Sequence, residues 1–277
     1  MRPLAYSIIL ALFLAVTQTP PLHADQSEEG DFIRDADRDF VGRLYHYVRS
    51  NQDGSRAEQI DVYRASETRI EVMKTTGQCR QAALVIAEMN FENWSADTIT
   101  GGALLPGGEV MEFAFLVRNP ATGDLHVEVN LPDQSLAFDI NIPATPWHLY
   151  DFDLANLTAM TPYLANPEAG FILHFGLMWA DPSHPEPVSY MGAQSFTPTL
   201  ANSDETAAHL RMVSSGEALG DGYLVLDAAD GYIIEAAFEV PNHPGYADFQ
   251  LRLTGIEEID ADGWQQHLVA QFENCDG

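Results

Sequence analysis

The sequence is short of basic residues, and of lysine above all. It contains 13 Lys and Arg against 41 Asp and Glu, so its formal net charge is −28, and Lys74 is the single lysine. Such an acidic chain repels the phosphates of nucleic acids and anionic lipid headgroups. We therefore expect neither nucleic-acid binding nor electrostatic docking to a membrane, and we attribute the acid excess to genome composition or a salty habitat rather than to a partner.

Long apolar runs are lacking too, except at the N-terminus. Arg2 precedes the apolar run 8–16, and the small-residue segment 22–24 (LHA) is followed by polar residues. This order predicts a cleavable signal peptide over residues 1–24. The alternative is a membrane anchor, but an anchor needs about 20 apolar residues, and Pro20-Pro21 would interrupt its helix. We expect a periplasmic or secreted protein with no integral membrane segment after cleavage.

Cysteine is scarce, with only Cys79 and Cys275 in the whole chain. Two cysteines this far apart form no Cys-x-x-Cys redox motif and are too few for a cysteine zinc site. In an exported chain such a pair predicts a disulfide. The bond would close a loop of about 200 residues and contribute on the order of 4 to 5 kcal/mol in the chain-entropy model. It also favours one domain over two.

Alternation of apolar and polar residues dominates the rest of the sequence. Residues 25–38 are acidic without a clear period, which predicts a flexible leader before a single β-rich domain over 39–277. Within that domain, the alternation and turn residues such as Asp53-Gly54 and Asp230-Gly231 predict antiparallel strands joined by hairpins. The expected strands cover 43–49, 57–64, 68–74, 83–91, 111–117, 125–131, 136–142, 171–179, 188–197, 207–213, 224–227, 232–240 and 247–253.

Helix signals are few. We expect one short helix over 154–164, with Asp151 or Asp153 as its N-terminal cap, and another over 264–272. The predicted fold is therefore mainly β. An antiparallel meander would form a strongly curved sheet, as an open or closed barrel, with one or two short helices. A two-layer sandwich is the alternative architecture.

Two local clusters are candidates for binding or chemistry. Trp147, His148, Asp151 and Asp153 place an imidazole and two carboxylates within a short segment, which could hold a divalent cation or serve as acid and base. A helix cap with packed aromatics explains the same residues, and we favour that interpretation. Asn242 and His243, on a Pro-bracketed loop, could contact a ligand, although a tight turn selects similar residues. These six residues lie in the segments 145–157 and 240–249.

Known metal and cofactor motifs are absent. The segment 258–263 resembles the start of a calcium loop, but the twelfth position, which needs a bidentate Glu, is Val269. The sequence has no Gly-x-Ser-x-Gly, no His-Glu-x-x-His, no phosphate-binding loop and no Gly-x-Gly-x-x-Gly. We expect no metal and no cofactor, and a binding protein rather than an enzyme.

Three segments carry a resemblance to other proteins: 45–55 (YHYVRSNQDGS), 148–157 (HLYDFDLANL) and 240–253 (VPNHPGYADFQLRL). In these the chain resembles a group of exported bacterial proteins without assigned function, which implies bacterial export. The pattern of a curved sheet is also similar to the half barrels of periplasmic lipoprotein carriers. That likeness is an analogy of fold, which does not establish function.

The concave face of the predicted curved sheet is the expected ligand-binding site. We expect it to bind a hydrophobic or lipid-like ligand, because its strands carry large aromatic side chains. The expected lining residues are Phe113, Phe115, Phe138 and Phe238. The alternative is a secreted glycan-active enzyme or carbohydrate-binding β-sandwich that uses exposed tryptophans and paired carboxylates. An interaction domain without a small-molecule site is a third interpretation.

Overall fold

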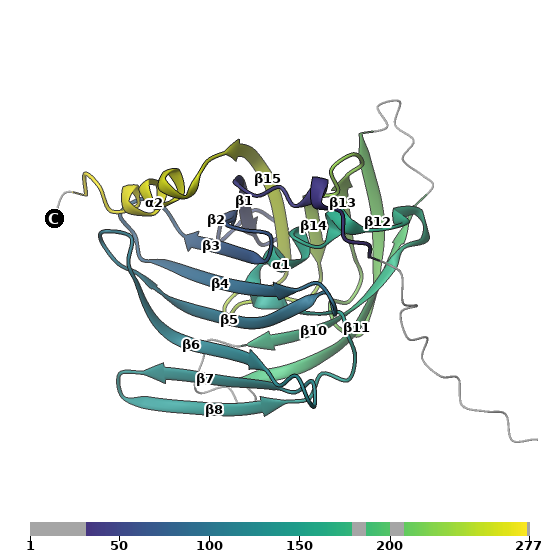
Figure 1. The fold of residues 1–277 in the computed structure, drawn as a ribbon, viewed down its shortest axis with the longest axis horizontal. Helices are drawn as coiled ribbons and strands as arrows, with labels where there is room; N and C mark the ends of the chain where they lie inside the picture. Colours follow the sequence, from purple (N-terminus) through teal and green to yellow (C-terminus); the bar gives the residue numbers. More distant parts are fainter. Residues whose placement is uncertain (1–31, 179–186, 200–207, 276–277) are drawn as a thin grey trace, which may run out of the picture.

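The alternating segments form one continuous sheet of fifteen strands in the part of the chain that the structure describes (Figure 1). The computed structural model describes residues 32–178, 187–199 and 208–275, so the predicted signal peptide and residues 25–31 of the predicted leader lie outside it. The strands are β1 (Arg43–Ser50), β2 (Glu58–Arg64), β3 (Arg69–Thr75), β4 (Ala82–Asn90), β5 (Ser95–Leu104), β6 (Val110–Arg118), β7 (Leu125–Leu131), β8 (Gln134–Ile140), β9 (Trp147–Leu149), β10 (Phe171–Met178), β11 (Val188–Pro198), β12 (His209–Gly216), β13 (Gly222–Asp227), β14 (Ile233–Phe238) and β15 (Phe249–Glu258).

The sheet consists of two meanders that meet in its middle. Strands β1 to β8 follow one another outward to one edge, and β10 to β15 return from the other edge until β15 pairs with β1. Every pair of neighbours is antiparallel except β9 and β10, which are parallel. The predicted antiparallel meander is therefore confirmed, and the sheet is open, because β8 and β9 form two separate edges.

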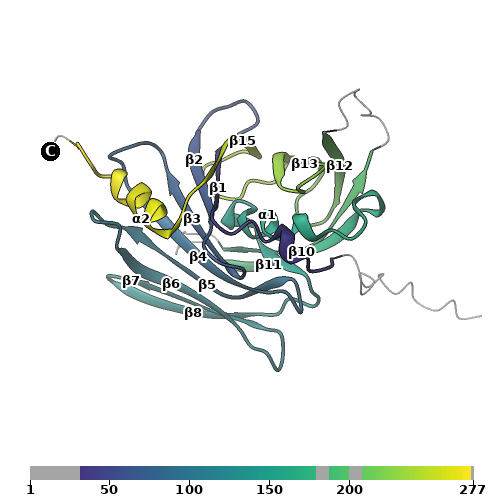
Figure 2. The same cartoon turned by 45° about the horizontal axis from the view of Figure 1, so that its top comes forward.

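The connection between the two edges explains the curvature. Only residues 141–146 join β8 to β9, and six residues span at most about 25 Å. A flat sheet of fifteen strands would hold its edges about 65 Å apart, at about 4.8 Å per strand. The sheet must therefore curve strongly, as predicted, and both views show it wrapped around α1 (Figures 1 and 2).

The concave face is filled by the segment 147–164, which we call the inner plug. It contains β9, the 3₁₀ turns Tyr150–Phe152 and Thr161–Tyr163, and the one-turn helix α1 (Ala155–Thr158) between them. Nearly all of its large side chains are buried in the main core, together with concave-face residues of both meanders. The plug's largest buried side chains are Trp147, Tyr150, Phe152 and Tyr163.

The predicted short helix over 154–164 is present only in part, as α1 (Ala155–Thr158) and the 3₁₀ turn Thr161–Tyr163, and its predicted cap is wrong. Asp153 and Leu154 both adopt left-handed backbone conformations, with φ of 51° and 58°, so no helix can run through them. Leu154 is the N-cap of α1 and makes no side-chain cap hydrogen bond. The Asp153 carboxylate is used elsewhere, as described below.

The end of the predicted leader packs against the plug. Phe32 is buried and bridges to Leu164, and the Ile33 amide donates a hydrogen bond of 2.8 Å to the Tyr163 carbonyl. The Arg38 guanidinium donates to the carbonyl of Pro162 at 2.7 Å. Residues 32–38 therefore cover one end of the plug.

The second helix, α2 (Ala261–Ala270), packs on the outer face of the sheet. Trp264 and Leu268 are buried against Leu44 and Tyr63, which lie on the face of the sheet opposite to the plug. The helix begins earlier than predicted because the Asp260 side chain accepts a hydrogen bond of 2.8 Å from the Gly263 amide. The acidic segment that resembles a calcium loop is thus a helix start.

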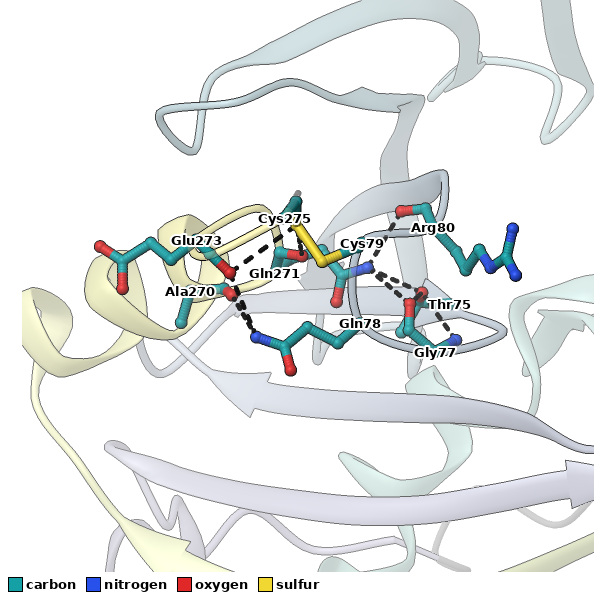
Figure 3. The surroundings of a disulfide bond; sticks show 9 residues. All are labelled: Thr75, Gly77, Gln78, Cys79, Arg80, Ala270, Gln271, Glu273 and Cys275. Carbon is teal, nitrogen blue, oxygen red and sulfur yellow. Dashed lines mark hydrogen bonds between the residues drawn. A yellow bond between two sulfur atoms is a disulfide. The ribbon is translucent and has the colours of Figure 1, made fainter. Parts of the chain in front are cut away.

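The predicted disulfide is confirmed. Cys79, in the β3–β4 connection, is bonded to Cys275, just after α2, with a Cα–Cα distance of 5.4 Å (Figure 3). The Gln271 side chain lies beside it and donates hydrogen bonds of 2.8 to 3.0 Å to Thr75 Oγ1 and to the carbonyls of Gly77 and Arg80. The end of the chain is therefore attached to the sheet both covalently and by hydrogen bonds.

Candidate functional site

The three sequence segments of the resemblance meet at one buried place. Asn242, between β14 and β15, donates a hydrogen bond of 2.7 Å to Asp153 Oδ1 and another of 3.2 Å to the Tyr150 carbonyl. Arg49 of β1 donates to the Asn242 amide oxygen and places its Nε 3.3 Å from Asp153 Oδ1. The ammonium of Lys74, on β3, forms an ion pair with the same carboxylate. We call these four residues, Arg49, Lys74, Asp153 and Asn242, the inner network.

One carboxylate thus pairs with two cations within the inner network. Burial alone would raise the pKa of Asp153, but Lys74, His243 and Arg49 together hold that pKa well below its ordinary value. Asp153 is therefore charged at any ordinary pH. Such a buried pair mainly fixes the plug to the sheet, because removing one partner would leave an uncompensated buried charge.

Three groups extend the inner network toward solvent. Arg49 Nη1 lies 3.6 Å from a carboxylate oxygen of Glu58, and the Arg49 guanidinium stacks 3.5 Å above the ring of Tyr246. His243 Nε2 lies 3.7 Å from Asp153 Oδ2. Burial lowers the pKa of His243 despite the nearby carboxylate, so this imidazole is neutral at pH 7. Asn242 and His243, which the sequence suggests as ligand contacts, thus also stabilise the fold.

A cavity lies next to the inner network, between β3 to β6 and the plug. Its volume is about 50 Å³, and it is partly open to solvent. Two polar side chains line it, those of Lys74 and Asp151, and the remaining lining is almost entirely carbon. The apolar lining includes Val85, Ile99, Ala114, Leu116, Leu149 and Phe152.

Asp151 gives the cavity a titratable group. Its side chain is buried and accepts a hydrogen bond of 3.2 Å from the Met178 amide. Burial raises the pKa of Asp151 to about 7, although the positive charge of Lys74 opposes the rise. Near neutral pH this carboxyl is therefore present in both its protonated and its charged form, so it can donate or accept a hydrogen bond inside the cavity.

Lys74 lines the cavity with its charge already engaged. Besides its ion pair with Asp153, its ammonium donates a hydrogen bond to the main-chain carbonyl of Asp151. An ammonium has three donors, so two are used within the protein. The lysine thus joins the cavity wall to the inner network and holds the start of the plug in place.

The four phenylalanines expected to line the concave face lie in different surroundings. Phe115 is a lining residue of the cavity, and Phe138 is half-buried against the main core. Phe238 is fully buried, with its ring stacked 5.8 Å from that of Phe249. Phe113 is only partly buried, because β6 turns Ala114 toward the core in register with Gly101. The four side chains do not form one continuous wall.

The cluster around His148 does not gather into a metal or acid–base site. Burial lowers the pKa of His148 to about 3, and its Nε2 lies 3.2 Å from the sulfur of Met160, away from both aspartates. Trp147 is buried, and its amide donates a hydrogen bond of 2.9 Å to Ser95 Oγ. In the described ranges, no group of three or more His, Cys, Asp and Glu has the geometry of a metal site.

Arg49 and Lys74 are the members of the site that the sequence interpretation missed. Each carries a signal, since Lys74 is the only lysine and Arg49 occupies the next position on the face that begins with Tyr45 and Tyr47. A charge in a row of buried side chains indicates a buried partner. The sequence does not reveal which carboxylate that partner is.

Comparison with known proteins supplies no name for this arrangement: no family model and no curated protein matches the chain. Within the described residues, no helix is both long and apolar enough to cross a membrane.

Proposed function

We propose that the protein is an exported binding protein that holds a small hydrophobic ligand in the cavity beside Asp151 and Lys74. The observation that carries this proposal is a carbon-lined cavity with only two polar side chains at one end. Pockets for small molecules have this composition, with a few polar groups that fix the orientation of the ligand. A buried carboxyl with a strongly shifted pKa in such a cavity is a further mark of a functional site.

The dimensions favour a small ligand over a long lipid. Ligand pockets range from about 300 to 1,000 Å³, whereas this cavity has a volume of only about 50 Å³, so only a small part of a ligand enters it and the rest lies at its opening. The plug occupies the rest of the concave face. A carbohydrate ligand has less support, because Trp147 and Trp264 are buried and Trp94 packs against Phe32 and Phe91, so none of these three offers a free ring to a sugar.

Export is supported by two independent features. Residues 1–24 have the pattern of a signal peptide, and disulfides such as Cys79–Cys275 persist mainly in oxidising compartments. Expression of the full chain in a Gram-negative bacterium, followed by N-terminal sequencing of the periplasmic fraction, tests this part. We expect a mature chain that begins at Asp25. An uncleaved chain retained in the cytoplasm or the membrane would contradict export.

Filling the cavity tests the binding site. A Cβ atom added at Gly101 would lie 3.7 Å from the Ala114 Cβ and 3.9 Å from a Val85 methyl, which are ordinary contacts. Gly101→Leu therefore fills the cavity without a backbone clash. Thr100→Leu is the matched control, because the neighbouring residue of a strand lies on the opposite face.

The measurement is a fluorescence titration with N-phenyl-1-naphthylamine, a small apolar probe. We expect saturable binding to the wild-type protein, binding at least ~10-fold weaker to Gly101→Leu, and a change below ~2-fold in Thr100→Leu. Equal binding to all three proteins would contradict the proposed site. Solvent extraction and mass spectrometry of protein purified from the periplasm would then identify any natural ligand.

A further inference from the structure

The polar end of the cavity has a simple charge balance. Arg49 and Lys74 contribute two positive charges, which the carboxylates of Asp153 and Glu58 balance. His243 faces Asp153 from the β14–β15 connection and is neutral at pH 7. The group therefore has no net charge when Asp151 is protonated, and it carries one negative charge when Asp151 is ionised.

Asp151 is the member of this group without a cation of its own. The hydrogen bond to its carboxyl group comes from the neutral Met178 amide. Lys74, its nearest positively charged neighbour, directs its ammonium to the Asp153 carboxylate and to the main-chain carbonyl of Asp151. No side chain in the described ranges forms an ion pair with the Asp151 carboxylate. A ligand that enters the cavity meets this carboxyl group with its charge unbalanced.

We propose that the cavity takes an apolar amine, whose ammonium group pairs with the Asp151 carboxylate while its hydrocarbon part lies along the carbon-lined wall and extends through the opening. This inference rests on the proposed function, since it names the ligand class of the same cavity. An ammonium makes the buried group electrically neutral with Asp151 ionised. A ligand with an anionic group would place a second negative charge beside Asp151, whose own ionisation burial already disfavours.

The charge of the whole protein acts in the same direction. A formal net charge of −28 raises the local concentration of cations and lowers that of anions. Lys74 opposes an incoming ammonium, but Asp153 already balances its charge. Alkylamines keep their proton at neutral pH, as the lysine side chain does with its ordinary pKa of about 10.4.

The proposal predicts a proton linkage. At pH 6, below the pKa of about 7, Asp151 is mostly protonated in the free protein and must lose its proton to pair with an ammonium. Binding should then release about 0.9 proton per ligand at pH 6 and nearly none at pH 8.5. A carboxylate ligand would instead hold the proton on Asp151, so it would bind with proton uptake at pH 8.5.

The test is isothermal titration calorimetry of the intact mature protein with octylamine, octanol and octanoate. These probes share a tail and differ only in the charge of the head. Proton release is obtained from the binding enthalpy in two buffers of different ionisation enthalpy. We expect octylamine to bind at least ~10-fold tighter than octanoate and ~3-fold tighter than octanol. In Asp151→Asn we expect octylamine to bind at least ~10-fold more weakly without proton release, and octanol within ~2-fold of wild type.

The outcomes separate the two proposals. If octanol or octanoate binds tighter than octylamine, the amine inference is overturned and the binding cavity stands. The inference also falls if Asp151→Asn binds octylamine as the wild type does. If none of the three probes binds, and Gly101→Leu changes nothing, the proposed function itself fails. Asp133→Asn, on the exposed β7–β8 turn, is the matched charge control and should behave as wild type. The comparison of octylamine, octanol and octanoate needs only wild-type protein, so it remains informative even if Asp151→Asn does not fold.

Discussion

Two buried aspartates, on opposite faces of the same sheet, hold the two helices in place by different chemistry. On the concave side, Asp153 of the plug pairs with Arg49 and Lys74. On the outer side, Asp61 of β2 accepts hydrogen bonds from His46 of β1 at 2.7 Å and from His267 of α2 at 2.9 Å. Asp153 and Asp61 are 1% and 0% exposed. Each site has one buried carboxylate that contacts two basic side chains, and the two sites differ in the type of these basic residues.

The difference in cation fixes the pH range of each site. The cations of the inner network are an arginine and a lysine, residue types that are ordinarily charged at neutral pH. Histidine loses its charge near neutral pH. The hydrogen bond to Asp61 raises the pKa of His46. Burial alone would raise the pKa of Asp61, but the hydrogen bonds from His267 and His46 lower it by more, so its pKa lies below the ordinary value. The outer site is therefore strongest between about pH 4 and pH 6.5.

Chain connectivity is the second difference. The plug is held at both ends, because it begins with β9 and is followed by β10, so the sheet fixes it on either side. Helix α2 follows β15, and no further strand follows it within the described residues, so a strand holds it on its N-terminal side alone. The disulfide between Cys79 and Cys275 supplies that second attachment (Figure 3). Helix α2 is thus attached by one strand and a disulfide, whereas the plug is attached by a strand on each side.

Removing the disulfide should break the outer site most severely. We expect the double variant Cys79→Ser/Cys275→Ser to lose about 4 to 5 kcal/mol of unfolding free energy, because the bond closes a long loop in the unfolded chain. Urea denaturation measures the loss. Wild-type protein treated with a reductant is the control and should show the same value. A loss below about 1 kcal/mol would mean that Gln271 and the Asp61 site alone hold α2.

Removing the inner carboxylate is expected to be the next largest effect. Asp153→Asn leaves Arg49 and Lys74 buried without their shared counter-charge, so we expect a loss of about 3 to 5 kcal/mol in urea unfolding at pH 7. Asp133→Asn makes the same change in charge at an exposed turn and should cost less than about 0.5 kcal/mol. Equal stability of the two variants would show that the inner network contributes nothing to the attachment of the plug.

The same substitution on the outer face sharpens the comparison. Asp61→Asn also removes a buried carboxylate, but the raised pKa of His46 depends on that carboxylate, so this imidazole can be neutral once the carboxylate is gone. We expect a smaller loss, about 2 kcal/mol at pH 6 and about 1 kcal/mol at pH 8.5. For Asp153→Asn the loss should be the same at both pH values. A pH-independent loss for Asp61→Asn would contradict the difference between the two sites.

Much of the sheet could be predicted from sequence because half-buried strands alternate by necessity. The hairpin of β1 and β2 around Asp53-Gly54 is an example. Strand β5 was missed, since Thr98, Thr100, Gly101 and Gly102 show no apolar alternation. Gly101 occupies a concave-face position where the neighbouring strands carry apolar side chains. Gly101 interrupts the apolar alternation that would have predicted β5, and because it has no side chain it also leaves space for the cavity.

The candidate site could be predicted only in pieces. Its members come from β1, β3, the plug and the β14–β15 connection, and pairing them requires the register of the whole sheet. The role of Asp153 was mistaken because a helix cap and a buried counter-ion use the same residue type. What separates the two roles is the left-handed conformation at Asp153 and Leu154, and neither residue type demands it. Long-range contacts, rather than local propensity, determine the conformation and the role of Asp153.

The smallest expected effect concerns His46 alone. Its folded pKa is raised, so its contribution to stability is fully present below its ordinary pKa of about 6.5 and is lost as the pH rises through the folded value. Compared with His46→Gln, the wild type should be more stable by less than about 1 kcal/mol at pH 5.5, after allowance for solvent screening, and equally stable at pH 9. Urea unfolding at the two pH values measures this. His209→Gln, at an exposed position, is the control, and its difference in stability from the wild type should be the same at both pH values. If the His46→Gln difference instead grows with pH, Asp61 pairs mainly with His267 rather than with His46.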